Sequence, residues 1–116
     1  MNIKIKKNKK YSELVNFKKN KSEKIHRWFN IKEGYSKDLI SILIDDLEIR
    51  KGFVVDFFNG SGTTSLVAKE KNHDYYGFEI NPFLYMLSKV KLADYTEKDI
   101  LCILELKISF LKNIKK

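Results

Sequence analysis

The stretch VVDFFNGSGTTSLVA, residues 54–68, decides the fold of this chain. Two β-branched residues run into Asp56, a Gly-Ser-Gly turn follows, and apolar residues then return at helical spacing. This order predicts a buried strand of the parallel-sheet type over residues 53–58, a glycine turn, and a helix over residues 63–71. Glycines in such a turn allow positive φ angles and let a ligand approach the backbone closely.

A second predicted strand, YYGFEI at residues 75–80, completes a βαβ unit. The right-handed crossover of such a unit brings the glycine turn and the end of the second strand together at the carboxyl edge of a parallel sheet, where ligands bind. Glu79 ends the second strand, nineteen positions after Gly60. A carboxylate at this position can accept both hydroxyls of a ribose. We therefore expect a ribose-bearing ligand at this edge.

Three further helices are predicted around this unit, so that the order is helix, strand, helix, strand, helix, helix. Ser36 is a good N-cap for the first of them. Asn81 with Pro82 starts the third helix, and Thr96, three residues before Asp99, opens the last one as a capping box. The first helix carries an apolar stripe of Leu39, Ile40, Leu43, Ile44 and Leu47.

The composition limits the class of protein. With 116 residues, 43% hydrophobic and 33% charged, a single globular domain is expected. No apolar run approaches the roughly 18 residues of a membrane span, and the N-terminus lacks the apolar segment of a secretory signal, so a cytoplasmic location is expected. Cys102 lies in the apolar pattern of the last helix and is predicted to be buried. No His, Cys or acid cluster has metal-ligand spacing, and no metal is expected.

The formal charge of +8 is concentrated at one end of the chain. Residues 1–27 carry all of this excess, while residues 28–116 are neutral. We therefore divide the chain into a basic, weakly ordered arm, residues 1–25, and an α/β domain, residues 26–116. Such an arm can follow the phosphate backbone of DNA. A lysine-rich composition without any function, as an AT-rich genome would produce, is an equally good interpretation.

The turn itself discriminates among ribose-bearing ligands. A P-loop places a Lys after its last glycine, whereas Thr63 follows Gly62 here, which disfavours a triphosphate. Ser65 fits the third small position of a dinucleotide fingerprint only approximately, so nicotinamide and flavin dinucleotides stay open. S-adenosylmethionine has a ribose, an adenine and a zwitterionic methionine end but no phosphate. It suits an Asp before the glycines and an acid at position 79.

The residues also carry a family resemblance. VVDFFNGSGTT followed by YYGFEINP resembles the S-adenosylmethionine-binding motifs of DNA methyltransferases that modify the exocyclic amine of adenine or cytosine. Their pattern is Asp-Pro-Phe-x-Gly-x-Gly-Thr-Thr and then Gly-x-Glu-x-Asn/Asp-Pro. Upstream, HRWFNIKEGYS is similar to the segment that precedes the glycine turn in members with this motif order. One departure is Phe57, which stands where the family usually has Pro and puts the stiffness of the turn in doubt.

The resemblance covers about residues 25–95 and implies a partial Rossmann-like methyltransferase fold with an incomplete parallel sheet. It implies S-adenosylmethionine as the cofactor and DNA as the partner. It also implies that Glu79 holds the ribose of the cofactor. The remaining cofactor-binding residues implied are Gly34, Tyr35 and Ser36 against the methionine moiety, and Asp56, Asn59, Gly60 and Gly62 in the turn.

Enzymes of this family use a second element, Asp/Asn/Ser-Pro-Pro-aromatic, that holds the target amine beside the methyl group. The 116 residues contain a single proline, Pro82, so this element is not among them and no catalytic residue is assigned. We therefore expect a chain that is inactive alone: the cofactor-binding half of a split enzyme that needs a second chain, or a truncated gene product. A non-catalytic module that binds S-adenosylmethionine or DNA, and a nucleotide-binding subunit of an oxidoreductase, are the alternatives.

Overall fold

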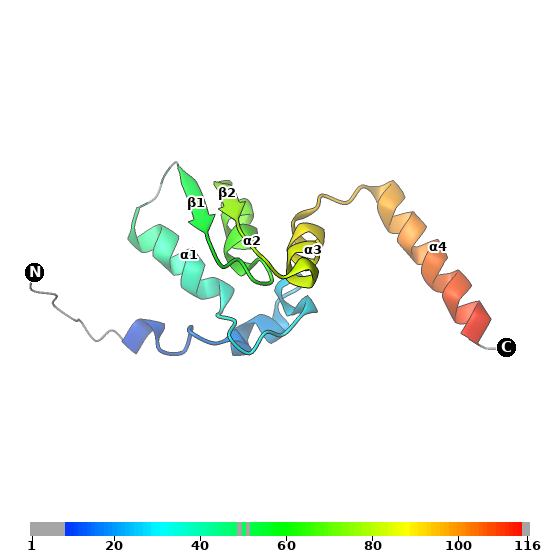
Figure 1. Ribbon diagram of the computed structural model, residues 1–116, viewed down its shortest axis with the longest axis horizontal. Coiled ribbons are helices and arrows are strands. Elements are labelled where there is room, and N and C mark those ends of the chain that lie inside the picture. Colours follow the sequence, from blue (N-terminus) through cyan, green and yellow to red (C-terminus); the bar gives the residue numbers. More distant parts are fainter. Residues whose placement is uncertain (1–8, 49, 51, 115–116) are drawn as a thin grey trace, which may run out of the picture.

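The computed structural model describes residues 9–48, 50 and 52–114. The predicted order of helices and strands is confirmed, and three short 3₁₀ helices precede it (Figure 1). The 3₁₀ helices are η1 (Lys9–Tyr11), η2 (Phe17–Ser22) and η3 (His26–Trp28). The helices and strands are α1 (Lys37–Asp46), β1 (Phe53–Asp56), α2 (Thr63–Glu70), β2 (Asp74–Gly77), α3 (Pro82–Leu92) and α4 (Glu97–Ile114).

The two strands form a parallel sheet in which Phe53 pairs with Asp74 and Asp56 pairs with Gly77. Parallel strands need a crossover connection, and α2 supplies it. The described chain is thus an α/β arrangement with a small parallel sheet and flanking helices, as predicted. Both strands end at the same edge, and the glycine turn leaves β1 there.

Local sequence sets where the helices begin. The Ser36 Oγ accepts a hydrogen bond of 3.2 Å from the Asp38 N–H at the start of α1. The Asn81 Oδ1 accepts from the first turn of α3, with Pro82 at its first position. Ahead of α4, the Asp99 carboxylate accepts from the Thr96 N–H at 2.9 Å. All three predicted caps are confirmed, because each depends on neighbours in sequence rather than on the fold.

Helix α2 is the centre of the core. Its residues Thr63 to Ala68 are all buried, and it packs against both strands and against α1. The opposite face of the sheet is not covered by any of the described helices. The prediction of a buried strand is therefore wrong for that face, because α2 covers one side of the sheet and no described helix covers the other. The exposed side chains on it are Phe53, Val55, Phe57, Tyr76 and Phe78.

The segment before α1 packs onto the domain. Leu14 and Phe17 are buried, and so is Asn20, whose side chain donates to the Tyr35 carbonyl and accepts from the Lys37 N–H, both at 2.8 Å. The buried Asn20 amide thus joins residues 9–25, the described part of the predicted arm, to the domain by hydrogen bonds to a distant segment. The division of the chain at residue 25 stays a prediction. Residues 1–8 of the predicted arm lie outside the described residues.

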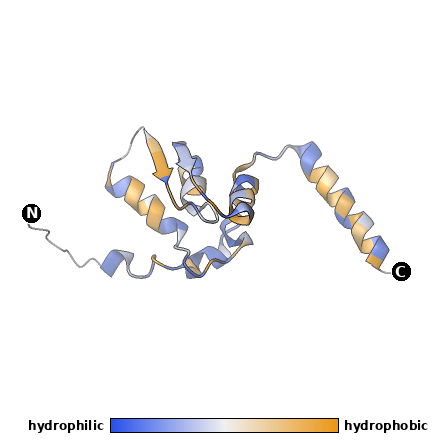
Figure 2. Cartoon of the chain, viewed as in Figure 1, coloured by the Kyte–Doolittle hydropathy of each residue, from blue (hydrophilic) through white to orange (hydrophobic). Residues whose placement is uncertain are grey.

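Helix α4 extends away from the other elements (Figure 1), and none of its residues is buried. Apolar residues recur along it, as Figure 2 shows. The prediction that Cys102 is buried is wrong: it is exposed because the helix that carries it has no described partner. Within the part of the chain that the structure describes, no helix is both long and apolar enough to cross a membrane.

Candidate functional site

The glycine turn and Glu79 meet at the carboxyl edge of the sheet. The Gly60 N–H donates to Glu79 Oε2 at 2.8 Å, and the Asn81 N–H donates to Glu79 Oε1 at 2.8 Å. Gly60 and Gly62 have φ values of +52° and +82°, which side chains with a Cβ rarely adopt. The two backbone donors orient the carboxylate, and each of its oxygens keeps a further lone pair for a ligand.

Asn59 holds the turn from inside. The Asn59 side chain is buried, and its Oδ1 accepts a hydrogen bond from the Ser65 hydroxyl at 2.7 Å. The backbone N–H of Asn59 donates to the Phe78 carbonyl at 2.9 Å. A Cβ at Gly77 would lie 2.5 Å from Asn59 Cγ, so only glycine fits there. Sequence reasoning missed Ser65 and Gly77 as supports of the turn. A glycine inside a strand, which commonly marks a close approach of another group, was the available signal for Gly77.

Tyr35 ties the segment before α1 to the end of β1. Its hydroxyl donates to Asp56 Oδ2 at 3.1 Å and shares a hydrogen bond with the Thr64 hydroxyl of α2. Asp56 Oδ1 accepts from the Phe58 N–H at 3.0 Å. Burial, opposed by the hydrogen bond with Thr64 and assisted by the neighbouring Asp56 carboxylate, raises the pKa of Tyr35 to about 12. The phenol therefore stays protonated and acts as a donor.

Gly34 and Ser36 flank this tyrosine but face different surroundings. A Cβ at Gly34 would lie 2.9 Å from Phe17 Cδ2, so η2 packs directly on this backbone. Ser36 is 0% exposed, its Oγ caps α1, and its N–H donates to the Leu14 carbonyl at 2.9 Å. Ser36 thus lies behind the site as a helix cap, while Gly34 and Tyr35 line it.

A cavity of about 130 Å³ lies between the segment before α1, the glycine turn and α3. Gly34, Tyr35, Asn59 and Gly60, four of the predicted residues, are among those that line it. Small-molecule pockets usually measure roughly 300–1,000 Å³, so this cavity accommodates part of a nucleoside-sized ligand. Asp56, Gly62 and Glu79 do not line it but fix the backbone around it.

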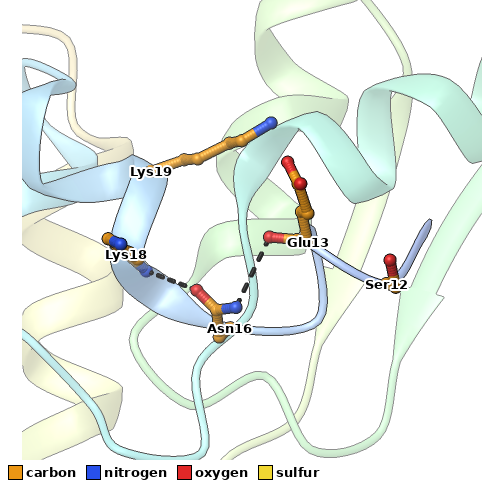
Figure 3. A pocket seen from close by; sticks show the side chains of 5 residues that line it. All are labelled: Ser12, Glu13, Asn16, Lys18 and Lys19. Atoms are coloured by element: carbon orange, nitrogen blue, oxygen red, sulfur yellow. Dashed lines mark hydrogen bonds between the residues drawn. The ribbon is translucent and has the colours of Figure 1, made fainter. Parts of the chain in front are cut away.

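A larger hollow of about 590 Å³ lies elsewhere, on the arm (Figure 3). Ser12, Glu13, Asn16, Lys18 and Lys19 line it, and none of the predicted site residues does. Asn16 Oδ1 accepts from the Lys18 N–H at 3.0 Å and so caps η2, and Asn16 Nδ2 donates to the Glu13 carbonyl at 3.4 Å; the dashed lines in Figure 3 mark these two bonds. This hollow is a surface feature of the capped turn. Among the residues that the structure describes, no group of His, Cys, Asp or Glu can hold a metal ion.

Two bases are buried where η3 and α3 meet the core. His26 and Lys91 are each 2% exposed, and their side-chain nitrogens have no hydrogen-bond partner among the described residues. Burial, and after it the charges of Lys37 and Lys91, lowers the pKa of His26 to about 4. Burial alone lowers the pKa of Lys91 to about 8. Both bases are therefore destabilised in their charged forms.

The amino-acid sequence is similar to those of known proteins. Residues 2–90 match the family described as DNA methylase of the N6/N4 type. The chain is 39% identical over 79 residues to the type II methyltransferase M.BsoBI of Geobacillus stearothermophilus, covering 67% of this chain and 16% of that protein. It is 31% identical over 97 residues to the type II methyltransferase M.AvaI of Nostoc sp., covering 79% of this chain and 20% of that protein.

A third relative is the type II methyltransferase M.HindIII of Haemophilus influenzae, 40% identical over 56 residues, which cover 48% of this chain and 18% of that protein. The chain thus spans a fifth or less of the length of these curated relatives. No solved structure matches the chain.

Proposed function

This chain belongs to the family of amino-methylating DNA methyltransferases, and we propose that it forms their S-adenosylmethionine-binding part, for methyl transfer to an exocyclic amine of adenine or cytosine in DNA. The observation that carries the proposal is the hydrogen bond of 2.8 Å between the Gly60 N–H and Glu79 Oε2. It joins the glycine turn to the acid that suits a ribose, at the edge of the sheet where nucleotides bind in α/β folds.

The residues present fit S-adenosylmethionine. Glu79 is oriented by two backbone N–H groups and has acceptor capacity left for two ribose hydroxyls. Asp56 ends β1 as a carboxylate beside the cavity wall and suits the ammonium group of the methionine moiety. Gly34 and Tyr35 line the cavity and would lie against that moiety. When bound, the cofactor supplies a methyl group on a positively charged sulfur, and this chain's residues bind and orient it.

We further propose that methyl transfer needs a second polypeptide that carries the Pro-Pro-aromatic element. Three observations support this. Pro82 is the single proline of the 116 residues, so the Pro-Pro-aromatic element is not among them. In the described chain, β1 pairs with β2 alone, so the other edge of β1 is free to take a further strand. An apolar groove of about 280 Å³ between α1 and β1 lies beside that edge.

Calorimetric titration of the 116-residue chain with S-adenosylmethionine tests the cofactor proposal. Glu79→Gln keeps the shape of the side chain but removes its charge, and we expect binding to weaken at least tenfold, because hydrogen bonds to a charged acceptor contribute about 1.5–3 kcal/mol each. Glu97→Gln, at the exposed start of α4, is the matched control and should bind like the parent. Tighter binding of a dinucleotide than of S-adenosylmethionine would favour the oxidoreductase alternative.

Methylation assays on duplex DNA test the second part of the proposal. The isolated chain should give no turnover, and turnover without another polypeptide would contradict it.

The arm is the proposed DNA contact. Lys18, Lys19 and Lys21 are exposed, whereas Lys10 pairs with Asp46 and Lys37 with Glu23. Counterion release makes the DNA affinity fall with salt, with a slope of about −0.9 per phosphate neutralised. Removing both charges, Lys18→Gln with Lys19→Gln, should reduce that slope by about 2. The control is the double variant Lys98→Gln with Lys112→Gln on α4, which should keep the salt dependence of the parent. Equal salt slopes for the two double variants would mean that the lysines of the arm reflect composition alone and do not contact DNA.

A further inference from the structure

Among the residues that the structure describes, two apolar surfaces lack a covering element. The first is the bare sheet face, formed by Phe53, Val55, Phe57, Tyr76 and Phe78, whose residues are between 46% and 69% exposed. Phe53 and Phe57 contact Tyr76 and Phe78 across the two strands, with ring centroids 5.5 Å apart in both pairs, so the face is continuous. Parallel sheets are normally covered by helices on both faces, and α2 covers only the other one.

The second surface is the apolar side of α4. At 100° per residue, Ile100, Leu104, Ile108 and Leu111 project from one side of this helix. Lys107 is the base on this side, and Glu97 is an acid on it at the first position of the helix. The four apolar residues are between 47% and 54% exposed. The opposite side of the helix carries Glu105, Ser109, Lys112 and Asn113. A helix with such a side is stable in water when another apolar surface covers it.

We propose that α4 of one copy packs on the bare sheet face of a second copy, and reciprocally, to form a two-fold symmetric dimer. The two surfaces are complementary: the apolar side of α4 has no sheet to pack on, and the bare sheet face has no helix that covers it. The start of α4 lines an apolar groove of about 470 Å³ with Trp28, Val90 and Tyr95 of its own chain. The rest of the helix extends away from the other elements and is free to reach another copy (Figure 1). A reciprocal contact of this kind closes on itself and needs no further partner.

The size of the surfaces is sufficient for a dimer. An aromatic side chain offers roughly 150–250 Å², and the aromatic members of the bare sheet face are at least half exposed, so this face presents on the order of 500 Å². Two such faces and two helix sides together bury on the order of 2,000 Å². Stable protein interfaces bury about 1,200–2,000 Å², so the contact reaches the required area.

The charges also match. Asp74 pairs in register with Phe53, so its side chain lies on the bare sheet face, where it is exposed. It is the acid on this face, and Lys107 is the base on the apolar side of α4. A helix that lies across the face brings an opposite charge to each of them, which favours this occupant over an apolar helix of arbitrary sequence.

Sedimentation of the full chain over a range of protein concentrations measures the oligomeric state. We expect a reversible dimer that Leu104→Asp converts to monomer. Ser109→Asp, on the polar side of the same helix, is the control and should leave the dimer intact. A monomer at all concentrations would overturn the proposal, whether α4 folds onto its own sheet or a different polypeptide covers the face.

A charge exchange tests the contact itself and does not depend on an apolar substitution. Lys107→Asp alone and Asp74→Lys alone should each weaken the dimer roughly tenfold, because two symmetric pairs of about 0.5–1 kcal/mol each are lost. The double variant should restore the affinity. A dimer that neither single variant weakens, or that the double variant does not restore, contradicts the proposed contact. Titration of Lys107→Asp with S-adenosylmethionine separates the two proposals, because its cofactor affinity should equal that of the parent.

Discussion

Replacing Gly77 with alanine should destabilise the domain, because Gly77 lies at the end of β2 against the Asn59 side chain of the glycine turn. The added Cβ would lie 2.5 Å from Asn59 Cγ, 2.6 Å from Asn59 Nδ2 and 2.8 Å from Ser65 Oγ. Ordinary contact requires about 3.5–4.0 Å, so the Asn59 side chain must shift by about 1 Å. That shift breaks its buried 2.7 Å hydrogen bond with Ser65. A lost buried hydrogen bond costs about 1–3 kcal/mol and overpacking adds about 1–3 kcal/mol, so we expect a loss of about 2–6 kcal/mol.

Gly60→Ala is the matched control, because it introduces backbone strain without a clash. The nearest atom to its Cβ would be Ile31 Cδ1 at 3.8 Å, but the φ of +52° costs a side chain about 1–2 kcal/mol. Urea unfolding followed by circular dichroism gives both free energies of unfolding. A Gly77→Ala protein within about 0.5 kcal/mol of the parent, or less affected than Gly60→Ala, would refute the reasoning that close packing against Asn59 holds the turn.

Three further outcomes are expected. Burial keeps the pKa of His26 near 4 in the folded chain, against 6.5 for the free group, so the unfolded chain takes up a proton first as the pH falls. The free energy of unfolding should therefore be highest above pH 6.5 and fall by about 3 kcal/mol as the pH drops to 4. Urea unfolding at several pH values measures this, and the His26→Gln variant should show a smaller decrease over the same range. Tyr35→Phe removes the hydroxyl shared by Asp56 and Thr64 and should cost about 1–2 kcal/mol in thermal or urea unfolding, whereas Tyr95→Phe, whose hydroxyl bonds to the Val90 carbonyl at the surface, should cost less. The exposed thiol of Cys102 should react with a thiol reagent in the folded chain, without denaturant. Reaction only after unfolding would mean that a partner covers the side of α4 that carries Cys102.

The α/β order and much of the site were predictable because they depend on short-range patterns. The caps at Ser36 and Asn81 are contacts between residues two or three positions apart. The approach of Glu79 to Gly60 was predictable as well, although the two are nineteen positions apart, because a right-handed crossover between parallel strands has essentially one geometry. The approximate place of the proposed cofactor site follows from the same rule.

Which side chains are buried could not be predicted from short-range sequence patterns. Both the strand at residues 53–58 and the helix that carries Cys102 have apolar patterns, and the sequence indicates that such surfaces are to be covered. Whether they are covered depends on which elements are present in three dimensions, and the described chain provides a helix for one face of the sheet only. The burial of Asn20, His26 and Lys91 was equally hidden, since polar residues enter a core where a particular neighbour leaves room for them.

The sequence by itself thus determined the element order, the turn and the family, because hydrophobic period, capping residues and glycine spacing act over a few residues or through one obligatory crossover. Only the tertiary structure decided that Ser36 lies behind the cavity, where its N–H donates to the Leu14 carbonyl, that Gly77 makes room for Asn59, and that Tyr35 links the segment before α1 to the end of β1. These are contacts between segments far apart in the chain, and their distances follow from how helices and strands pack rather than from any local pattern.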